Sequence, residues 1–166
     1  MDMLIEPAGW ARWGSHRWRC ALGKGGVRTA KREGDLATPA GAFVMRRLLY
    51  RPDRGAAPAT RLPMAPIAAD DGWCDDPADA AYNRPVKVPY RTRTERLWRD
   101  DRLYDLLVVL GYNDDPAIAG AGSAIFLHVA SANYAPTEGC VALAPEVLRR
   151  VLAEADATSR VVVTAP

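Results

Sequence analysis

The chain has 166 residues, of which 49% are hydrophobic and 25% are charged, and its net charge is only +2. These proportions are typical of a soluble globular protein and exclude a disordered chain, and the small net charge excludes a dedicated nucleic-acid binder. The length predicts a single domain over residues 1–166. No apolar run approaches the ~20 residues of a membrane-spanning helix. Residues 1–19 lack the pattern of a signal peptide, so neither a membrane-spanning helix nor a signal peptide is predicted.

The first third of the chain alternates short apolar stretches with turn-forming residues, which is typical of β-structure. In residues 16–22 every second side chain is apolar, which places Trp18, Cys20 and Leu22 on one side of a predicted strand. The glycine-rich turn after them predicts a return strand from Val27. Residues 42–50 predict a further strand. The proline- and alanine-rich residues 51–70 predict mostly loop.

Two stretches of opposite charge follow this loop. Five aspartates lie between residues 70 and 79, and seven basic residues outnumber three acidic ones between residues 84 and 102. One interpretation is that two solvated surfaces partly neutralise each other. The other is that the basic stretch helps to hold an anionic substrate. The aspartate spacing does not match a calcium-binding loop, so no metal site is predicted there.

The C-terminal part of the chain predicts the central elements. Residues 103–112 and 124–130 are mostly apolar without a clean polar alternation, as expected of central strands buried on both faces. Residues 145–155 predict a helix, because proline suits its first turn and its apolar residues form one stripe. Residues 160–164 predict a last strand. One helix beside six or more strands predicts a mainly β, sandwich-like domain.

The cysteines and histidines limit the chemistry that the chain can perform. The three cysteines, Cys20, Cys74 and Cys140, leave one unpaired whatever the redox state, which argues against a disulfide scaffold. With only two histidines, no structural zinc site is predicted. Cys20 alternates with Trp18 and Leu22, and we expect it to pack in the core.

His128 and Cys140 are the candidates for catalysis. His128 lies late in an apolar strand, a polar loop follows, and Gly139 precedes the cysteine. Residues placed on either side of such a loop can meet in space. An imidazole would then deprotonate a thiol nucleophile, and backbone N–H groups would face the developing oxyanion. The alternative is that both are core residues, because lone cysteines are commonly buried as small hydrophobes. Spacing alone leaves both interpretations open.

Three segments of the chain resemble the L,D-transpeptidase catalytic domain, the YkuD-like family. Residues 33–43 look like its Thr-Pro-x-Gly-x-Phe segment, and residues 122–128 look like its histidine strand. Residues 137–141 are similar to its Ser/Thr-x-Gly-Cys-hydrophobic signature. The resemblance runs from about residue 16 to the C-terminus. It implies a β-sandwich with mixed sheets and one or two packed helices.

The resemblance implies an enzyme that acts on peptidoglycan stem peptides. Cys140 would attack the carbonyl of the third residue of a tetrapeptide stem, release D-alanine and form a thioester, with His128 as base and then acid. The backbone carbonyl of Val129 would orient the histidine, and the N–H groups of Gly139 and Cys140 would face the oxyanion. No cofactor and no metal are implied. Carbapenem β-lactams would acylate the same cysteine.

Two departures from the family pattern concern how the substrate is held. Many relatives carry histidine or lysine at the position of Glu138, and arginine at the position of Ala142. We expect Thr137 and Glu138 to contact the substrate and Arg84 to substitute for the missing arginine. The loop between the histidine and the cysteine has only 11 residues. This fits a subgroup with altered acceptor choice, such as members that make 1,3 rather than 3,3 cross-links.

Three functions follow from these observations. The first is a transpeptidase that cross-links stem peptides, which would act in the periplasm or cell envelope. The second is an L,D-carboxypeptidase that uses water as the acceptor, which the lack of a visible signal peptide favours because stem-peptide recycling is cytoplasmic. The third is a non-catalytic wall-binding module. The predicted partners are peptidoglycan stem peptides and no nucleic acid.

Overall fold

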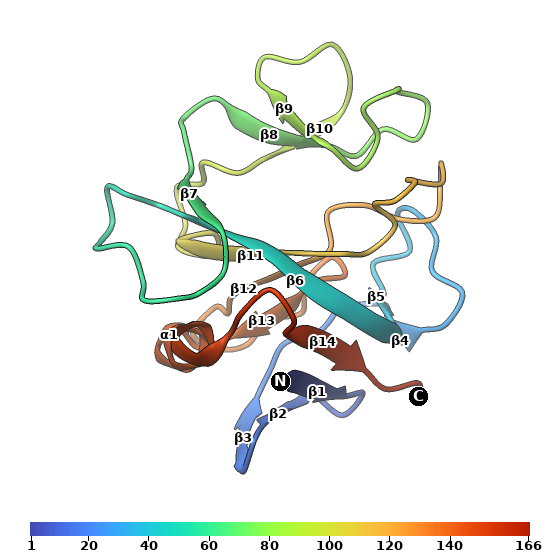
Figure 1. Cartoon of the computed structure of the whole chain (residues 1–166). Coiled ribbons are helices and arrows are strands. Elements are labelled where there is room, and N and C mark those ends of the chain that lie inside the picture. Colours follow the sequence, from blue (N-terminus) through green and yellow to red (C-terminus); the bar gives the residue numbers. More distant parts are fainter.

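The computed structural model describes residues 1–166 and consists mainly of strands (Figure 1). The strands and the one helix are β1 (Asp2–Glu6), β2 (Trp10–Trp13), β3 (His16–Arg19), β4 (Val27–Arg28), β5 (Thr38–Pro39), β6 (Gly41–Tyr50), β7 (Met64–Pro66), β8 (Asp71–Cys74), β9 (Pro85–Lys87), β10 (Thr94–Arg96), β11 (Leu106–Leu110), β12 (Phe126–Val129), β13 (Val141–Leu143), α1 (Pro145–Glu154) and β14 (Arg160–Val163). The predicted mainly β fold with mixed sheets and a packed helix is therefore confirmed.

The largest sheet has nine strands and curls on itself. Eight strands follow the order β13–β12–β11–β6–β14–β1–β2–β3, and β7 pairs with β6 beside this path. The pairs β12–β13, β1–β14 and β6–β7 are parallel, which makes the sheet mixed. Ala21, two residues after β3, exchanges two backbone hydrogen bonds of 2.9 Å with Ala142 of β13. This contact joins the two ends of the path, so the large sheet is nearly a closed barrel.

Both faces of the central strands are buried. In β11, Leu106, Val108 and Leu110 belong to the main core, whereas Leu107 and Val109 belong to a second cluster on the other face. The apolar face of α1 packs into the main core. Burial on both faces explains why β11 has no polar alternation. With 10 residues, α1 is too short to cross a membrane, and the chain has no other helix.

A smaller sheet covers the outer face of the large one. This upper sheet contains β8, β9 and β10 in the order β10–β8–β9, and Figure 1 shows it above β11. Trp73 of β8 packs edge-on against Phe126 of β12, with ring centroids 5.2 Å apart. Leu97 and Leu107 belong to the same buried cluster. The two sheets are thus joined by an apolar contact, beside which the cavities described below open.

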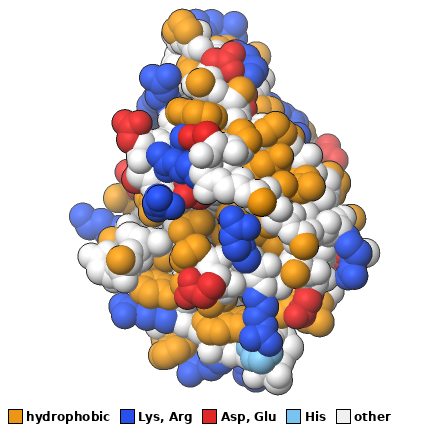
Figure 2. Space-filling view, turned by 90° about the vertical axis from the view of Figure 1, so that its left-hand side faces the viewer, with side chains coloured by type: hydrophobic (Ala, Val, Ile, Leu, Met, Phe, Trp, Pro, Cys, Tyr) orange, Lys and Arg blue, Asp and Glu red, His pale blue; other side chains and the backbone are white.

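The two stretches of opposite charge pair with each other around the upper sheet. Their ion pairs are Arg91–Asp79, Arg93–Asp75, Lys87–Asp70 and Lys87–Asp71, with N–O distances of 2.6–3.0 Å. In Figure 2, basic and acidic side chains are interspersed and do not gather into one field of a single sign. Mutual neutralisation, the first interpretation of these stretches, therefore describes these pairs.

The return strand expected from Val27 has a different partner from the one predicted. β4 does begin at Val27, but it pairs in parallel with β5 and not with β3. The preceding glycines allow a close backbone approach instead of a hairpin. A Cβ at Gly23 would lie 2.3 Å from the Leu36 oxygen, and the Gly23 N–H donates to Thr38 Oγ1 at 2.8 Å. The strands β1 and β2 and those of the upper sheet were not predicted, because each has only 3–5 residues and gives too short a pattern.

Candidate active site

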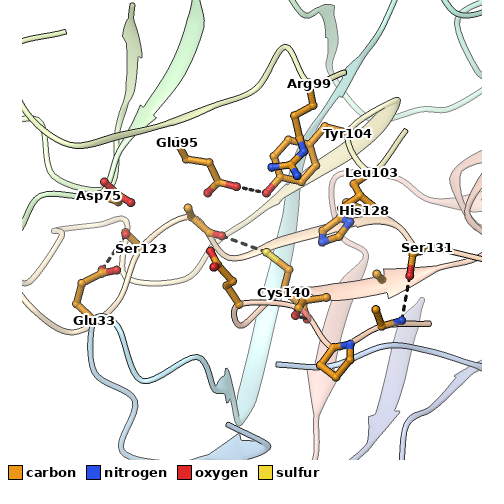
Figure 3. A pocket seen from close by; sticks show the side chains of 16 residues that line it. Glu33, Asp75, Glu95, Arg99, Leu103, Tyr104, Ser123, His128, Ser131 and Cys140 are labelled. Atoms are coloured by element: carbon orange, nitrogen blue, oxygen red, sulfur yellow. Dashed lines mark hydrogen bonds between the residues drawn. The ribbon is translucent and has the colours of Figure 1, made fainter. Parts of the chain in front are cut away.

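The large sheet brings His128 and Cys140 to one cavity. His128 lies in β12, and Cys140 immediately precedes β13, the parallel neighbour of β12. His128 is paired with Ala142, so Cys140 lies two residues before the partner of His128 and on the same face. Both side chains line a cavity of about 350 Å³ between the large and upper sheets (Figure 3).

A tight turn presents the cysteine. Gly139 has a φ of +134°, and a Cβ there would lie 2.9 Å from the Ala37 oxygen, so glycine is required. The Gly139 N–H donates to Thr137 Oγ1 at 3.2 Å, and the same hydroxyl donates to the Cys140 oxygen at 2.7 Å. The turn is therefore fixed from within. The Gly139 N–H, an expected oxyanion donor, is already engaged in it.

Backbone groups hold the Cys140 thiol, which is buried. Sγ donates to the Ala124 oxygen at 3.3 Å, drawn as a dashed line in Figure 3, and accepts from the Phe126 N–H at 3.4 Å. Burial, and then the nearby charge of Glu95, raise the pKa of the thiol to about 12. The resting cysteine is therefore a neutral thiol at pH 7 and not a preformed thiolate.

His128 is buried in a fixed orientation. Its Nδ1 lies 2.9 Å from the Val129 carbonyl oxygen, which is the contact that the family resemblance implies. A carbonyl oxygen only accepts, so Nδ1 carries the proton and the lone pair of the neutral ring is on Nε2. Burial lowers the pKa of the imidazole to about 4, which keeps the ring neutral at pH 7. No hydrogen bond joins His128 to Cys140 in this arrangement, so their action as a pair stays a prediction.

Acidic side chains dominate the walls of this cavity. The charged lining residues are Glu33, Asp75, Glu95 and Glu138 on the acidic side and Arg99 on the basic side. Glu33 accepts hydrogen bonds from the hydroxyls of Tyr82 and Ser123, at 2.5 and 2.8 Å. Asp75 is paired with Arg93, whereas Glu95 forms no ion pair. The excess of carboxyl groups favours a cationic group in the cavity.

Tyr104 connects three polar side chains around one ring. Its hydroxyl donates to Glu95 Oε1, as Figure 3 shows, and its ring packs edge-on against His128 with centroids 5.2 Å apart. The Arg99 guanidinium lies 5.0 Å from the centre of the same ring, and Asp101 holds it through two hydrogen bonds of 2.6 and 2.9 Å. Burial raises the pKa of Glu95 to about 7. This carboxyl group therefore changes charge near neutral pH.

The remaining predicted site residues lie in different places. Thr137 and Glu138 line the cavity with Cys140, whereas Arg84 lines a separate one. Arg99 was counted only among the seven basic residues of the basic stretch, and neither Glu95 nor Tyr104 was predicted as a site residue. The available signal was a tyrosine among mixed charges. That pattern does not show which side chains the upper sheet turns inward.

A comparison with protein families matches nearly the whole chain. The family model YkuD, described as the L,D-transpeptidase catalytic domain, matches residues 11–163. The match spans the strand that carries His128, the turn that carries Cys140, and the upper sheet. No curated protein matches the chain.

Proposed function

The chain belongs to the L,D-transpeptidase catalytic domain family, and from this premise we propose that it cross-links peptidoglycan stem peptides of the cell envelope through a thioester on Cys140. The observation that carries the proposal is the shared cavity. A thiol and an oriented, neutral imidazole line it together, among carboxyl groups suited to an amine. His128 is the proposed base, and Val129 positions it.

Two neutral groups begin the proposed reaction. Cys140 Sγ attacks the carbonyl carbon of the third stem residue while His128 Nε2 takes the thiol proton. For this step the thiol turns from the Ala124 oxygen toward His128 Nε2. Catalytic hydrogen bonds such as the one between Cys140 and His128 often tighten only once the substrate is bound. The imidazolium that forms keeps its Nδ1–H bond to the Val129 oxygen, which stabilises the positive charge.

The tetrahedral intermediate then collapses to the thioester. The bond from the carbonyl carbon to the D-alanine nitrogen breaks, and the imidazolium returns its proton to that nitrogen. The Cys140 N–H is the proposed donor to the oxyanion. The Gly139 N–H joins it only by giving up its 3.2 Å bond to Thr137 Oγ1, so we assign Gly139 the role of shaping the turn.

The charges of the cavity support an amine as the acceptor. An amine arrives largely as an ammonium ion, which Glu95 and the other carboxyl groups attract. Glu95 forms no ion pair within the chain and is free to bind such a group. Its pKa of about 7 also suits it to take a proton from the ammonium before the amine attacks the thioester. The amine nitrogen then bonds to the carbonyl carbon and the carbon–sulfur bond breaks, while His128 carries the second proton of the attacking nitrogen to the leaving Cys140 sulfur. Arg99 is the one cation in the cavity, and its terminal nitrogen that Asp101 does not engage is the proposed donor to a stem carboxylate.

The test uses purified protein and a disaccharide tetrapeptide, with products identified by mass spectrometry. We expect cross-linked dimers and free D-alanine, and none of either with Cys140→Ala. Fragmentation of the dimer identifies the acceptor amine and separates 3,3 from 1,3 cross-links. Tripeptides without dimers would replace this proposal with a carboxypeptidase. Neither product, together with no acyl-enzyme, would indicate a non-catalytic wall-binding module.

A second measurement tests the role assigned to Glu95. With Glu95→Gln, we expect the ratio of dimer to tripeptide to fall about tenfold, because the amine loses its ionic partner while water does not. Glu146→Gln is the matched control, since Glu146 lies in the first turn of α1. An unchanged ratio in the Glu95 variant would refute this role.

A further inference from the structure

A second cavity of about 610 Å³ lies beside the first and has the opposite charge. Its charged lining residues are Arg46, Arg47, Arg84 and Asp114. Phe126 stands between the two cavities. It packs edge-on against Tyr104, which lines the first, and against Trp73, which lines the second. The aromatic contact that joins the two sheets therefore separates an acidic cavity from a basic one.

Arg47 is the most unusual residue in this cavity. Its Nε is the only buried side-chain nitrogen or oxygen of the chain without a hydrogen-bond partner. Arg47 also forms no ion pair. A buried donor that lacks an acceptor costs about 1–3 kcal/mol, and more when it is charged. The Arg47 side chain lines the cavity, and its terminal nitrogens, which make no hydrogen bond within the chain, are the atoms that an anionic ligand there would reach.

The other two arginines extend this arrangement. Arg84 has no carboxylate partner within the chain, and Arg46 is held by Asp114 through bonds of 3.0 and 3.2 Å. Gly111 leaves room for Arg46, because a Cβ there would lie 2.8 Å from its Nε. The cavity thus presents two guanidinium groups without partners beside one that is neutralised.

The segment that carries Arg84 is firmly anchored. The preceding Asn83 is buried, and its side-chain oxygen accepts from the Trp73 indole at 2.9 Å and from the Ala124 N–H at 3.0 Å. Its amide donates to the Tyr112 and Asn113 oxygens at 3.0 and 2.8 Å. These bonds fix the backbone before Arg84, so the Arg84 side chain extends from a segment that is already ordered before a ligand binds.

We propose that this cavity is a docking subsite for a peptide carboxylate that lies next to a small apolar side chain, separate from the peptide that reacts at Cys140. Guanidinium groups bind carboxylates through paired hydrogen bonds. Apolar residues, among them Trp73, Val109 and Phe126, complete the lining and suit an alkyl group better than a bare phosphate. That the peptide is a second stem of the same polymer rests on the proposed function.

Binding is tested by nuclear magnetic resonance without any turnover. The probes are N-acetyl-D-alanine, its neutral carboxamide and inorganic phosphate. The reporters are the Arg47 Nε–H and the Trp73 indole N–H signals. We expect the carboxylate to shift both signals in a saturable way, and the carboxamide to bind at least about tenfold more weakly. Equal binding of acid and amide, or binding of phosphate alone, would overturn the proposal.

Variants locate the subsite. We expect Arg47→Met and Arg84→Met each to weaken binding of the acid about tenfold. Arg12→Met, at an exposed position of β2, should leave it unchanged. Arg47→Met keeps the aliphatic stem and removes the unpartnered Nε, so it should fold with undiminished thermal stability. Unchanged binding in the folded variant would refute the site.

A separate measurement distinguishes failure of the subsite from failure of the proposed function. Acylation of Cys140 by a carbapenem should be the same in wild type, Arg47→Met and Arg84→Met, because that small ligand does not need the second cavity. If neither wild type nor the two variants are acylated, the proposed function fails, and the binding experiment still decides whether the subsite exists. Acylation with no binding of N-acetyl-D-alanine would reject the subsite alone.

Discussion

Replacing His128 with alanine tests the proposed base. The Cys140 thiol has a pKa of about 12, so without help from a base only about 10⁻⁵ of the cysteine is ionised at pH 7. In the proposed mechanism, wild type avoids this limit because His128 Nε2 takes the proton during the attack, and its pKa of about 4 leaves the nitrogen unprotonated at pH 7. We expect the variant to lose about 10²–10⁴-fold in acylation at pH 7. This loss equals about 2.7–5.5 kcal/mol of activation free energy.

The assay follows formation of a carbapenem adduct by intact mass across a pH series. Wild type should acylate at a rate that changes little above about pH 5, where the imidazole is neutral. His128→Ala should accelerate about tenfold for each unit of pH, because it depends on spontaneous ionisation of the thiol. His16→Ala is the control. His16, the other histidine of the chain, stacks on Trp18 and hydrogen-bonds to Arg150.

Two results would refute this reasoning. If His128→Ala acylates like wild type near neutral pH, then His128 is a core residue and not the base. If Cys140→Ala still forms an adduct, Cys20 or Cys74 is the nucleophile. Cys20 is an unfavourable candidate, because it packs in the main core and does not line the cavity that holds His128.

Three further changes probe the architecture around the site. Gly139→Ala should cost about 1–3 kcal/mol in the free energy of unfolding and abolish acylation, because its φ of +134° and the Ala37 oxygen at 2.9 Å exclude a Cβ. Gly14→Ala, at a φ of +56° with open space around it, should leave acylation intact, and equal loss in both would contradict this explanation. Asn83→Ala should lower the free energy of unfolding by about 2–4 kcal/mol in a denaturant titration, because it orphans buried backbone and indole groups; a loss under about 0.5 kcal/mol would contradict the anchoring role. The folded-state pKa of Glu95 is raised to about 7, so its contribution to stability is present below about pH 4.5 and is lost as the pH rises to 7. Because glutamine does not ionise, Glu95→Gln should avoid this pH-dependent loss of stability, which amounts to up to about 3 kcal/mol, and should melt at a higher temperature than wild type near pH 8. A lower melting temperature of the variant at pH 8 would show that the carboxylate is stabilising.

The candidate nucleophile and base were accessible from the sequence because their signals are local. Gly139 directly precedes Cys140, and the strand that carries His128 is continuously apolar. The length of the loop between them was also visible. The resemblance to the family rested on these contiguous segments, and the family match covers all of them. The predicted helix likewise followed from one stripe of apolar residues and a proline, and α1 begins at that proline.

The surroundings of the pair could not be predicted, because they depend on contacts between segments far apart in the chain. The upper sheet is short and polar, so no hydrophobic period marks it, and only its packing on the large sheet turns Glu95 inward. The same packing places Arg99 in the acidic cavity and Arg84 in the basic one. No local rule distinguishes these two arginines within one basic stretch.

The sequence by itself therefore determined the mainly β fold and the choice of Cys140 and His128 as the candidate thiol and imidazole. Periodicity and turn chemistry, which determine such features, act over a few residues. Only the tertiary structure decided that both groups are neutral at rest, because burial dominates the pKa of each. It also decided that two cavities of opposite charge flank Phe126, since a side chain's environment depends on which strands pack against it and not on its neighbours in sequence.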